Sequence, residues 1–272
     1  MGWLGADEGL VRKLVIDAVR IKDLINPEEL KKVEPEEEVT FKVRPLPVEA
    51  KTIMSLAEFY RLSDFNNVPM ELTESINYLM SRKINVGKYD FYWTPESEHN
   101  YHKRVIVPCY WKGELIGSTA RTFDQEVKPK YYSDYEPNYV FNIDNQKPDS
   151  QFVIAMEGPF DAMAVDGIGF LGSECSDVQA DIVDSLGKEV IVVPDFDVKI
   201  VRGKSVWAGV SLVDQAIEYG WSVSFPIWRE EVKDVSAAVE KYGKLFVMKS
   251  IIEGKQTSRL KIELMKKRIH NK

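Results

Sequence analysis

Two short apolar runs, each followed by acidic residues, decide the fold. The first reads FVIAMEGPFD (residues 152–161) and the second reads VIVVPDFD (residues 190–197). Short β-branched runs bounded by turn residues are typical of parallel strands that are covered on both faces. In open α/β sheets the ligand binds beyond the carboxyl ends of such strands. We therefore expect four carboxylates to meet at one rim of a sheet, those of Glu157, Asp161, Asp195 and Asp197.

The chain around these runs alternates between strand and helix patterns. Strands are predicted at 152–156, near 168–171, at 190–193 and at 222–225, and helices are predicted near 160–165, 178–186 and 206–219. Such alternation implies right-handed crossovers and a mostly parallel, Rossmann-like sheet. A last helical stretch is predicted at 245–269, and it ends in a basic segment.

The residues before 152 follow a different pattern. Helical spacing is seen at 8–25 and again from 49 to 83, with an acidic linker at 34–38 between them. Aromatic and β-branched residues then predict strands near 89–93, 105–108 and 115–117, the last two forming a hairpin with Gly113 in its turn. This predicts four segments: N-terminal helices and linker (1–48), a mixed α+β basic subdomain (49–148), an α/β domain (149–244) and a basic C-terminal helix (245–272).

Composition narrows the class of protein. The chain has 272 residues with 44% hydrophobic and 29% charged residues, which is ordinary for a globular protein. A net charge of -7 argues against a wholly basic nucleic-acid coat but leaves a local basic face open. Only Cys109 and Cys175 are present, without a CxxC pair, so we expect no zinc site. We expect no signal peptide or membrane span, and hence a cytoplasmic location.

The acidic rim suggests metal chemistry. Asp195 and Asp197 occupy alternate positions, so in an extended segment they would point the same way. Neighbouring carboxylates repel and need a counter-charge, which Mg²⁺ or Mn²⁺ supplies while also binding phosphates. Each of these acidic segments has an ordinary structural explanation when it is considered alone: residues 195–197 could form a polar turn, and Glu157 could be an acid at a helix N-terminus. Because both segments follow strands of the same predicted sheet, we interpret them together as a functional site. A second type of acidic pocket is that of response regulators. It needs a phosphorylatable aspartate and a later lysine at set positions, and the sequence does not show that spacing clearly.

Three acidic segments resemble the motifs of the TOPRIM fold, which is shared by bacterial-type primases, topoisomerases and some nucleases. These segments are residues 157–162, 194–197 and 233–236. Upstream, residues 78–84 resemble the primase helix before the basic subdomain. Residues 104–108 and 129–133, with Gly113, Gly117 and Arg121, resemble that basic subdomain in the catalytic core of DnaG-type primases. The resemblance covers roughly residues 71–244.

The resemblance implies roles for particular residues. It implies Mg²⁺ or Mn²⁺ held by five carboxylates, those of Glu157, Asp161, Asp195, Asp197 and Asp234. It also implies catalysis by Glu157, Asp195 and Asp197, with Glu157 in proton transfer or metal contact. Template and incoming nucleotide would contact Arg104, Arg121, Lys130 and Tyr131. Basic residues interleaved with aromatics over 101–132 suit a single-stranded track, although an ordinary exposed sheet face with solvated lysines has the same composition.

The chain departs from the family in several places. The zinc ribbon that usually precedes the core is missing, so a separate zinc-bearing chain would recognise the template. Asn142 and Ile143 stand where a lysine usually follows the aromatic matched by Phe141, and Ser236 stands where a second acid is common. The basic tail after Gly254 could contact a helicase or nucleic acid, or be a solvated helix. Such a reduced core looks phage-encoded, which would place it in the host cytoplasm.

The interpretation is a primase catalytic core, a DNA-directed RNA polymerase. It would make short RNA primers on single-stranded DNA from ribonucleoside triphosphates by Mg²⁺-dependent nucleotidyl transfer. Two alternatives stay open: a TOPRIM-type nuclease, and a non-catalytic DNA-binding replication accessory. A topoisomerase is less favoured because the chain is too short for a strand-passage arch.

Overall fold

The computed structural model describes residues 38–63, 65–95, 100–201, 204–228 and 232–270. The chain divides into two compact units, one ending at Thr40 and one spanning Phe41–Lys272. Of the first unit only residues 38–40 are described, so the helix predicted at 8–25 and the acidic linker predicted at 34–38 lie, apart from residue 38, outside the described residues. All elements discussed below belong to the second unit.

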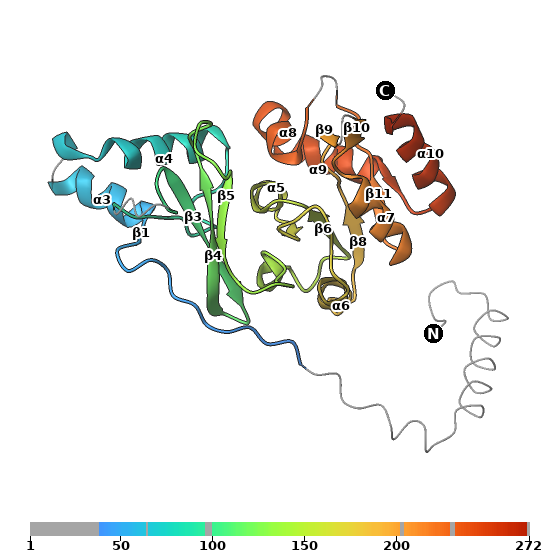
Figure 1. Cartoon of the computed structure of the whole chain (residues 1–272), viewed down its shortest axis with the longest axis horizontal. Coiled ribbons are helices and arrows are strands. Elements are labelled where there is room, and N and C mark those ends of the chain that lie inside the picture. Colours follow the sequence, from blue (N-terminus) through green and yellow to red (C-terminus); the bar gives the residue numbers. More distant parts are fainter. Residues whose placement is uncertain (1–37, 64, 96–99, 202–203, 229–231, 271–272) are drawn as a thin grey trace, which may run out of the picture. The chain divides into compact units, whose positions relative to one another are not determined.

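The first half of this unit is an antiparallel sheet with the strand order β1-β2-β3-β4-β5, in blue to green in Figure 1. Its strands are β1 (Lys51–Thr52), β2 (Tyr92–Trp93), β3 (Arg104–Trp111), β4 (Glu114–Thr122) and β5 (Tyr131–Asp134). The predicted hairpin is confirmed. Its two-residue turn places Lys112 at φ 51° and Gly113 at φ 81°, and positive φ at both central residues matches the twist of the flanking strands.

Helices lie between β1 and β2 in the chain. The helical pattern predicted over 49–83 is two helices, α3 (Ile53–Ser63) and α4 (Met70–Ser81), separated by the 3₁₀ turn η1 (Phe65–Asn67). Pro69 is the N-cap residue of α4. A proline lacks the backbone N–H and disfavours helix in the residue before it, so the first helix cannot run through into the second.

The second half is a mostly parallel sheet with the order β12-β11-β8-β6-β7. Its strands are β6 (Phe152–Met156), β7 (Ile168–Gly169), β8 (Glu189–Val192), β11 (Ser222–Ser224) and β12 (Lys255–Gln256), and only β12 runs antiparallel to its neighbour. Its helices are α5 (Pro159–Val165), α6 (Asp177–Asp184), α7 (Val210–Glu218), α8 (Val235–Tyr242), α9 (Lys244–Glu253) and α10 (Arg259–His270). The predicted fold class, a mostly parallel α/β domain after a mixed α+β subdomain, is confirmed.

Two predicted helices are wrong in part. The helix predicted at 206–219 begins only at Val210, because β9 (Val198–Val201) and β10 (Lys204–Trp207) form a hairpin directly after Asp197. The helix predicted at 245–269 is interrupted by β12, which pairs with β11. Gly254 makes this turn possible, since a Cβ there would lie 2.9 Å from the backbone of Phe225.

The helix α9 packs into the core of the parallel sheet. Its residues Val247 and Ile251 are buried in the same hydrophobic cluster as Phe160 of α5 and Val235 of α8. The predicted division of the chain into four segments stays a prediction, but the start of the 245–272 segment is part of this core. Among the residues that the structure describes, none of the helices has the length and apolar character needed to cross a bilayer.

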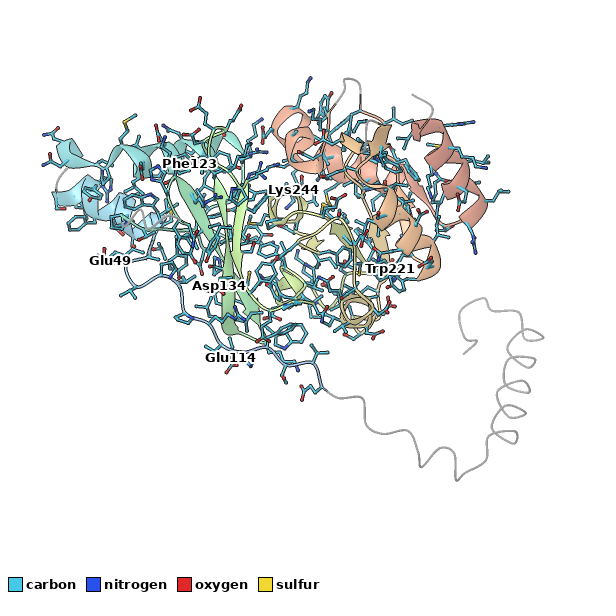
Figure 2. All side chains as sticks on the ribbon, in the orientation of Figure 1. Glu49, Glu114, Phe123, Asp134, Trp221 and Lys244 are labelled. Atoms are coloured by element: carbon cyan, nitrogen blue, oxygen red, sulfur yellow. The ribbon has the colours of Figure 1, made fainter. Side chains whose placement is uncertain are left out.

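The two sheets share one core, and two of the contacts that join them lie away from α8. Phe141 forms an isolated antiparallel bridge with Gly169 at the edge of β7, with N–H to O distances of 2.8 and 3.2 Å. Asp166, just after α5, accepts from Lys88 Nζ (2.8 Å), Tyr89 Oη (3.0 Å) and Lys244 Nζ (2.7 Å). Lys244, labelled in Figure 2, begins α9. Asp166 therefore ties the segment before β2 to the parallel-sheet helices.

We expect the Asp166→Asn variant to be less stable at pH 7 but not at pH 2. Partial burial raises the pKa of Asp166, but hydrogen bonds from Lys244 and Lys88 outweigh it and leave the pKa lowered. The ionised form therefore stabilises the fold above the usual carboxyl pKa, and this contribution is lost as the pH falls through the lowered pKa. Because the side chain is 35% exposed, solvent screening limits the loss at pH 7 to about 0.5–1 kcal/mol.

Urea unfolding at both pH values measures this difference. Asparagine tolerates the φ of 57° at this position, so the backbone should be unaffected. Asp181→Asn on the exposed face of α6 is the matched control. An equal loss at both pH values would show that the charge of Asp166 does not matter.

Candidate active site

One pocket of about 330 Å³ collects residues from both sheets. From the parallel sheet and its helices it is lined by Glu157, Gly158, Pro159, Asp161, Leu171, Gly172, Ser173, Asp195, Asp197 and Asp234. From the antiparallel sheet it is lined by Thr119, Arg121, Lys130, Tyr131, Ser133 and Tyr135. The five predicted carboxylates and three of the four predicted nucleic-acid-binding residues therefore lie around one pocket. Their roles remain predictions.

Backbone amides hold two of the acids in place. Asp161, in the first turn of α5, is 7% exposed and accepts the backbone N–H of Ser236 at 2.8 Å. Asp234 is the N-cap residue of α8 and accepts the N–H of Ala237 at 2.7 Å. The residue before α5 is Gly158, where a Cβ would lie 3.0 Å from Asp161 Oδ2. Because glycine has no Cβ, the Asp161 carboxylate fits beside the backbone of residue 158.

The segment 195–197 is held by its backbone. Trp207 Nε1 donates to the carbonyl of Asp195 at 2.6 Å, and Phe196 N donates to the carbonyl of Lys233 at 2.8 Å. At Gly209 a Cβ would lie 2.8 Å from the Asp195 carbonyl oxygen, so the chain passes behind the site only with glycine here. Lys233 Nζ lies 3.4 Å from Asp197 Oδ1, in an exposed pair. The hairpin after Asp197 therefore braces the acidic segment from outside.

The acids raise one another's pKa. Burial raises the pKa of Asp195 to about 7, and the charges of Glu157, Asp234 and Asp197 add to the effect. Burial also raises the pKa of Asp161, with further contributions from Asp234 and Asp195. Each shift means that negative charge at this rim lacks a sufficient counter-charge within the protein. Binding a cation would relieve the repulsion.

The donor set fits a hard divalent ion. All five acidic side chains offer carboxylate oxygens, which Mg²⁺ prefers. Within the described ranges, no three histidine, cysteine or acidic side chains already lie close enough to enclose one ion. Mg²⁺ usually binds through one or two carboxylates with water or phosphate oxygens completing its shell, and this rim can supply such carboxylates.

The opposite wall is basic and aromatic. Arg121 on β4 donates from Nη1 to Tyr131 Oη on β5 at 2.5 Å. Its guanidinium also lies 5.0 Å from the ring centre of Phe160 and 5.9 Å from that of Tyr78. Cation–π contacts on several sides fix the direction of this group. Arg121 therefore joins α4, α5 and the antiparallel sheet at the pocket.

Lys130 is the second cation of this wall. Its side chain is exposed, yet partial desolvation and the charge of Arg121 lower the pKa of Lys130. The carboxylates of Asp234 and Asp161 act in the opposite direction, which shows that the lysine lies within electrostatic reach of the acids. The two walls therefore face each other with opposite charge.

Arg104 stands apart from the other three predicted nucleic-acid-binding residues. Arg104 does not line the pocket: it is 2% exposed, and its guanidinium donates to the carbonyls of Ala120 (3.3 Å), Lys130 (3.1 Å) and Pro129 (2.5 Å). Arg104 is therefore buried away from the pocket, and its role in nucleic-acid binding stays a prediction. Its place in the structure is to hold the segment that carries Lys130 against β4.

The sequence reasoning missed a link between the two halves. Arg82, just after α4, donates to Ser236 Oγ at 3.3 Å and pairs with Glu240 Oε1 at 3.1 Å. It thereby holds α8, whose N-terminus carries Asp234. The primase-like helix pattern included Arg82, but no periodicity pairs residues 154 positions apart.

The sequence reasoning also missed the uncharged lining, Thr119, Ser133, Tyr135 and Ser173. Strand alternation could have found the first two. Thr119 lies two positions from Arg121, and Ser133 lies two positions from Tyr131, so each shares a sheet face with a predicted residue.

This fold, an antiparallel subdomain joined to a mostly parallel sheet with helices, is that of the catalytic core of DnaG primases. The RNA polymerase domain of Mycobacterium tuberculosis primase DnaG is similar with a TM-score of 0.56 and 16% identity, over 75% of this chain and 83% of that one. A DnaG primase catalytic domain bound to single-stranded DNA gives 0.53 and 15%, over 74% and 78%.

A third structure, the zinc-binding and RNA polymerase domains of Aquifex aeolicus primase, gives a TM-score of 0.54 and 21% identity over 75% of this chain. The match spans 60% of the length of that structure. No protein-family model matches this chain, and no curated protein matches it. At these identities the similarity is one of fold.

We expect Asp161→Asn to stabilise the protein at pH 8, in the presence of a chelator, by roughly 1–3 kcal/mol. The folded state holds the proton of Asp161 more tightly than the unfolded chain does, because burial and neighbouring acids raise its pKa to about 7. The associated stability is complete below the ordinary carboxyl pKa and is lost as the pH rises through about 7. An asparagine oxygen can still accept from Ser236 N but carries no charge.

Thermal unfolding at pH 4 and pH 8 checks this expectation. The variant and the parent should differ at pH 8 and converge at pH 4, while Asp181→Asn changes neither. If Asp161→Asn destabilises the fold at pH 8, the carboxylate is compensated within the protein and the charge imbalance at the rim is not real.

Proposed function

We propose that the chain is a primase catalytic core that joins ribonucleotides into short primers on single-stranded DNA. The observation that carries the proposal is the pocket in which five carboxylates face Arg121 and Lys130. Nucleotidyl transfer needs this arrangement, since a phosphoryl group with its metal must be neutralised from one side and oriented from the other. The similarity in fold to DnaG primase catalytic domains supports it.

Each wall has a distinct part in the proposed reaction. Asp195, Asp197, Asp161 and Asp234 are the candidates for holding Mg²⁺ or Mn²⁺, which when bound would neutralise the phosphates. Arg121 and Lys130 would bind the triphosphate of the incoming nucleotide, with Tyr131 fixing Arg121. Glu157 lies within electrostatic reach of Asp195 and would contact the metal or receive a proton from the attacking hydroxyl.

The proposed partners follow from the proposed primase activity. A DnaG catalytic domain of similar fold is bound to single-stranded DNA, and the Mycobacterium tuberculosis domain is in complex with double-stranded DNA. We propose a single-stranded DNA template and ribonucleoside triphosphates for this chain. A zinc-bearing template-recognition chain, a replicative helicase, a phage origin and a cytoplasmic location belong to the same proposal.

A primer-synthesis assay tests the proposal. With circular single-stranded DNA of mixed sequence, Mg²⁺ or Mn²⁺ and labelled ribonucleotides, the parent should make short RNA. Asp195→Asn and Asp197→Asn should each lower incorporation by about 10²-fold or more, because each removes charge at the centre of the rim. Lys130→Ala should lower it as well, by about tenfold or more, through the lost contact to the triphosphate.

Matched controls separate the rim from general charge effects. Asp149→Asn and Lys147→Ala change exposed residues outside the pocket and should leave incorporation unchanged. Cleavage of the DNA without incorporation would favour the TOPRIM-type nuclease. DNA binding that survives both aspartate changes, with no incorporation by the parent, would favour the non-catalytic accessory.

A further inference from the structure

The basic wall has a second row of side chains that the proposed function does not use. In the register of β4 and β5, Arg121 stands opposite Tyr131, and Thr119 stands opposite Ser133. Residues two apart on a strand share a face, so both pairs lie on the face that lines the pocket. Thr119 Oγ1 and Ser133 Oγ are hydrogen-bonded at 2.9 Å. We call this pair the hydroxyl rung.

The hydroxyl rung is extended by a third group. Burial raises the pKa of the Tyr135 phenol, and its hydrogen bond with Ser133 acts in the opposite direction. The side chains of Tyr135, Ser133 and Thr119 therefore form a row of hydroxyls along one side of the pocket. Each hydroxyl can donate one hydrogen bond and accept two, so a row of three has acceptor sites and one donor left for a ligand.

The pocket thus has a charged part and a neutral polar part. Arg121, Lys130 and the acids are suited to phosphates and their cation, whereas hydroxyls without charge are suited to other hydroxyls. Along the strands the rung lies about 7 Å from the Arg121–Tyr131 pair. That spacing is comparable with the separation of the phosphate and the sugar hydroxyls within one nucleotide. A nucleotide with its phosphate at Arg121 can therefore bring its sugar edge to the rung.

We propose that the Thr119–Ser133 rung binds the ribose hydroxyls of the incoming nucleotide and favours ribonucleotides over deoxyribonucleotides. The proposal rests on the nucleotidyl-transfer function proposed for the same pocket. The 2′-hydroxyl, a donor and an acceptor, is the group by which a protein distinguishes the two sugars. Thr119 and Ser133 are hydrogen-bonded to each other when no ligand is present. A deoxyribonucleotide, which lacks the 2′-hydroxyl, therefore leaves neither hydroxyl without a hydrogen-bond partner. The preference should therefore be modest.

A purely structural role makes a different prediction. Cross-strand threonine and serine pairs also stabilise sheets by themselves. If the rung acts only in this way, removing a hydroxyl would lower thermal stability and affect both kinds of nucleotide equally. Sugar discrimination is therefore the measurement that separates the two roles.

The experiment measures binding of ATP and of dATP, each with Mn²⁺, by isothermal titration calorimetry. We expect the parent to bind ATP more tightly and Thr119→Val, which is close in shape but lacks the hydroxyl, to lose about five- to tenfold of that preference. Thr119→Ser keeps the hydroxyl and should keep the preference. Ser133→Ala, at the exposed end of the rung, provides a second variant should Thr119→Val fail to fold.

Ser118→Ala is the matched control, since it removes a buried hydroxyl from the opposite face of the same strand. It should leave the ratio unchanged. Equal affinity of the parent for both nucleotides, or a preference that survives Thr119→Val and Ser133→Ala, would overturn the rung's role while leaving the proposed function in place. No binding of either nucleotide, together with no primer synthesis, would overturn both.

Discussion

Desolvation and mutual repulsion of carboxylates gathered around one pocket are the constraint on which the rest of this site depends. Glu157, Asp161, Asp195, Asp197 and Asp234 lie around one pocket, and burial together with their neighbours raises the pKa of Asp161 and Asp195. A protein holds such a charge excess only where packing elsewhere is strong enough to maintain it. Three hydrogen bonds hold the acidic segments in place here. The backbone amides of Ser236 and Ala237 donate to Asp161 and Asp234, and the Trp207 indole donates to the Asp195 carbonyl.

The positive charge that faces these carboxylates comes from a different part of the chain. Arg121 is held by Tyr131, Phe160 and Tyr78, which come from β5, α5 and α4. Arg82 connects α4 to α8 in the same region. The two sheets are therefore linked by arginine contacts at the edge of the pocket and by Phe141 and Asp166 elsewhere. A shared core beneath these contacts makes the relation of the two walls a property of the whole unit.

Sequence reasoning was most reliable where local physics leaves few choices. The run 152–156 is a strand with the bounds expected, since an apolar β-branched run followed by glycine and proline has few other solutions. It missed the hairpin after Asp197, where it assigned no element to 198–205 and began a helix at 206 that starts only at Val210. It did not foresee that Arg104 is buried on backbone carbonyls, and the role expected of this residue stays a prediction.

What the sequence by itself determined is the type of sheet and the identity of the acids beyond its strands, because side-chain alternation and strand-end position are local properties. What only the tertiary structure decided is which groups meet. The pairing of Arg82 with Glu240, the three rings around Arg121 and the rung of Thr119 with Ser133 all join distant segments. Such contacts depend on strand register and on how the sheets pack, and a linear pattern records neither.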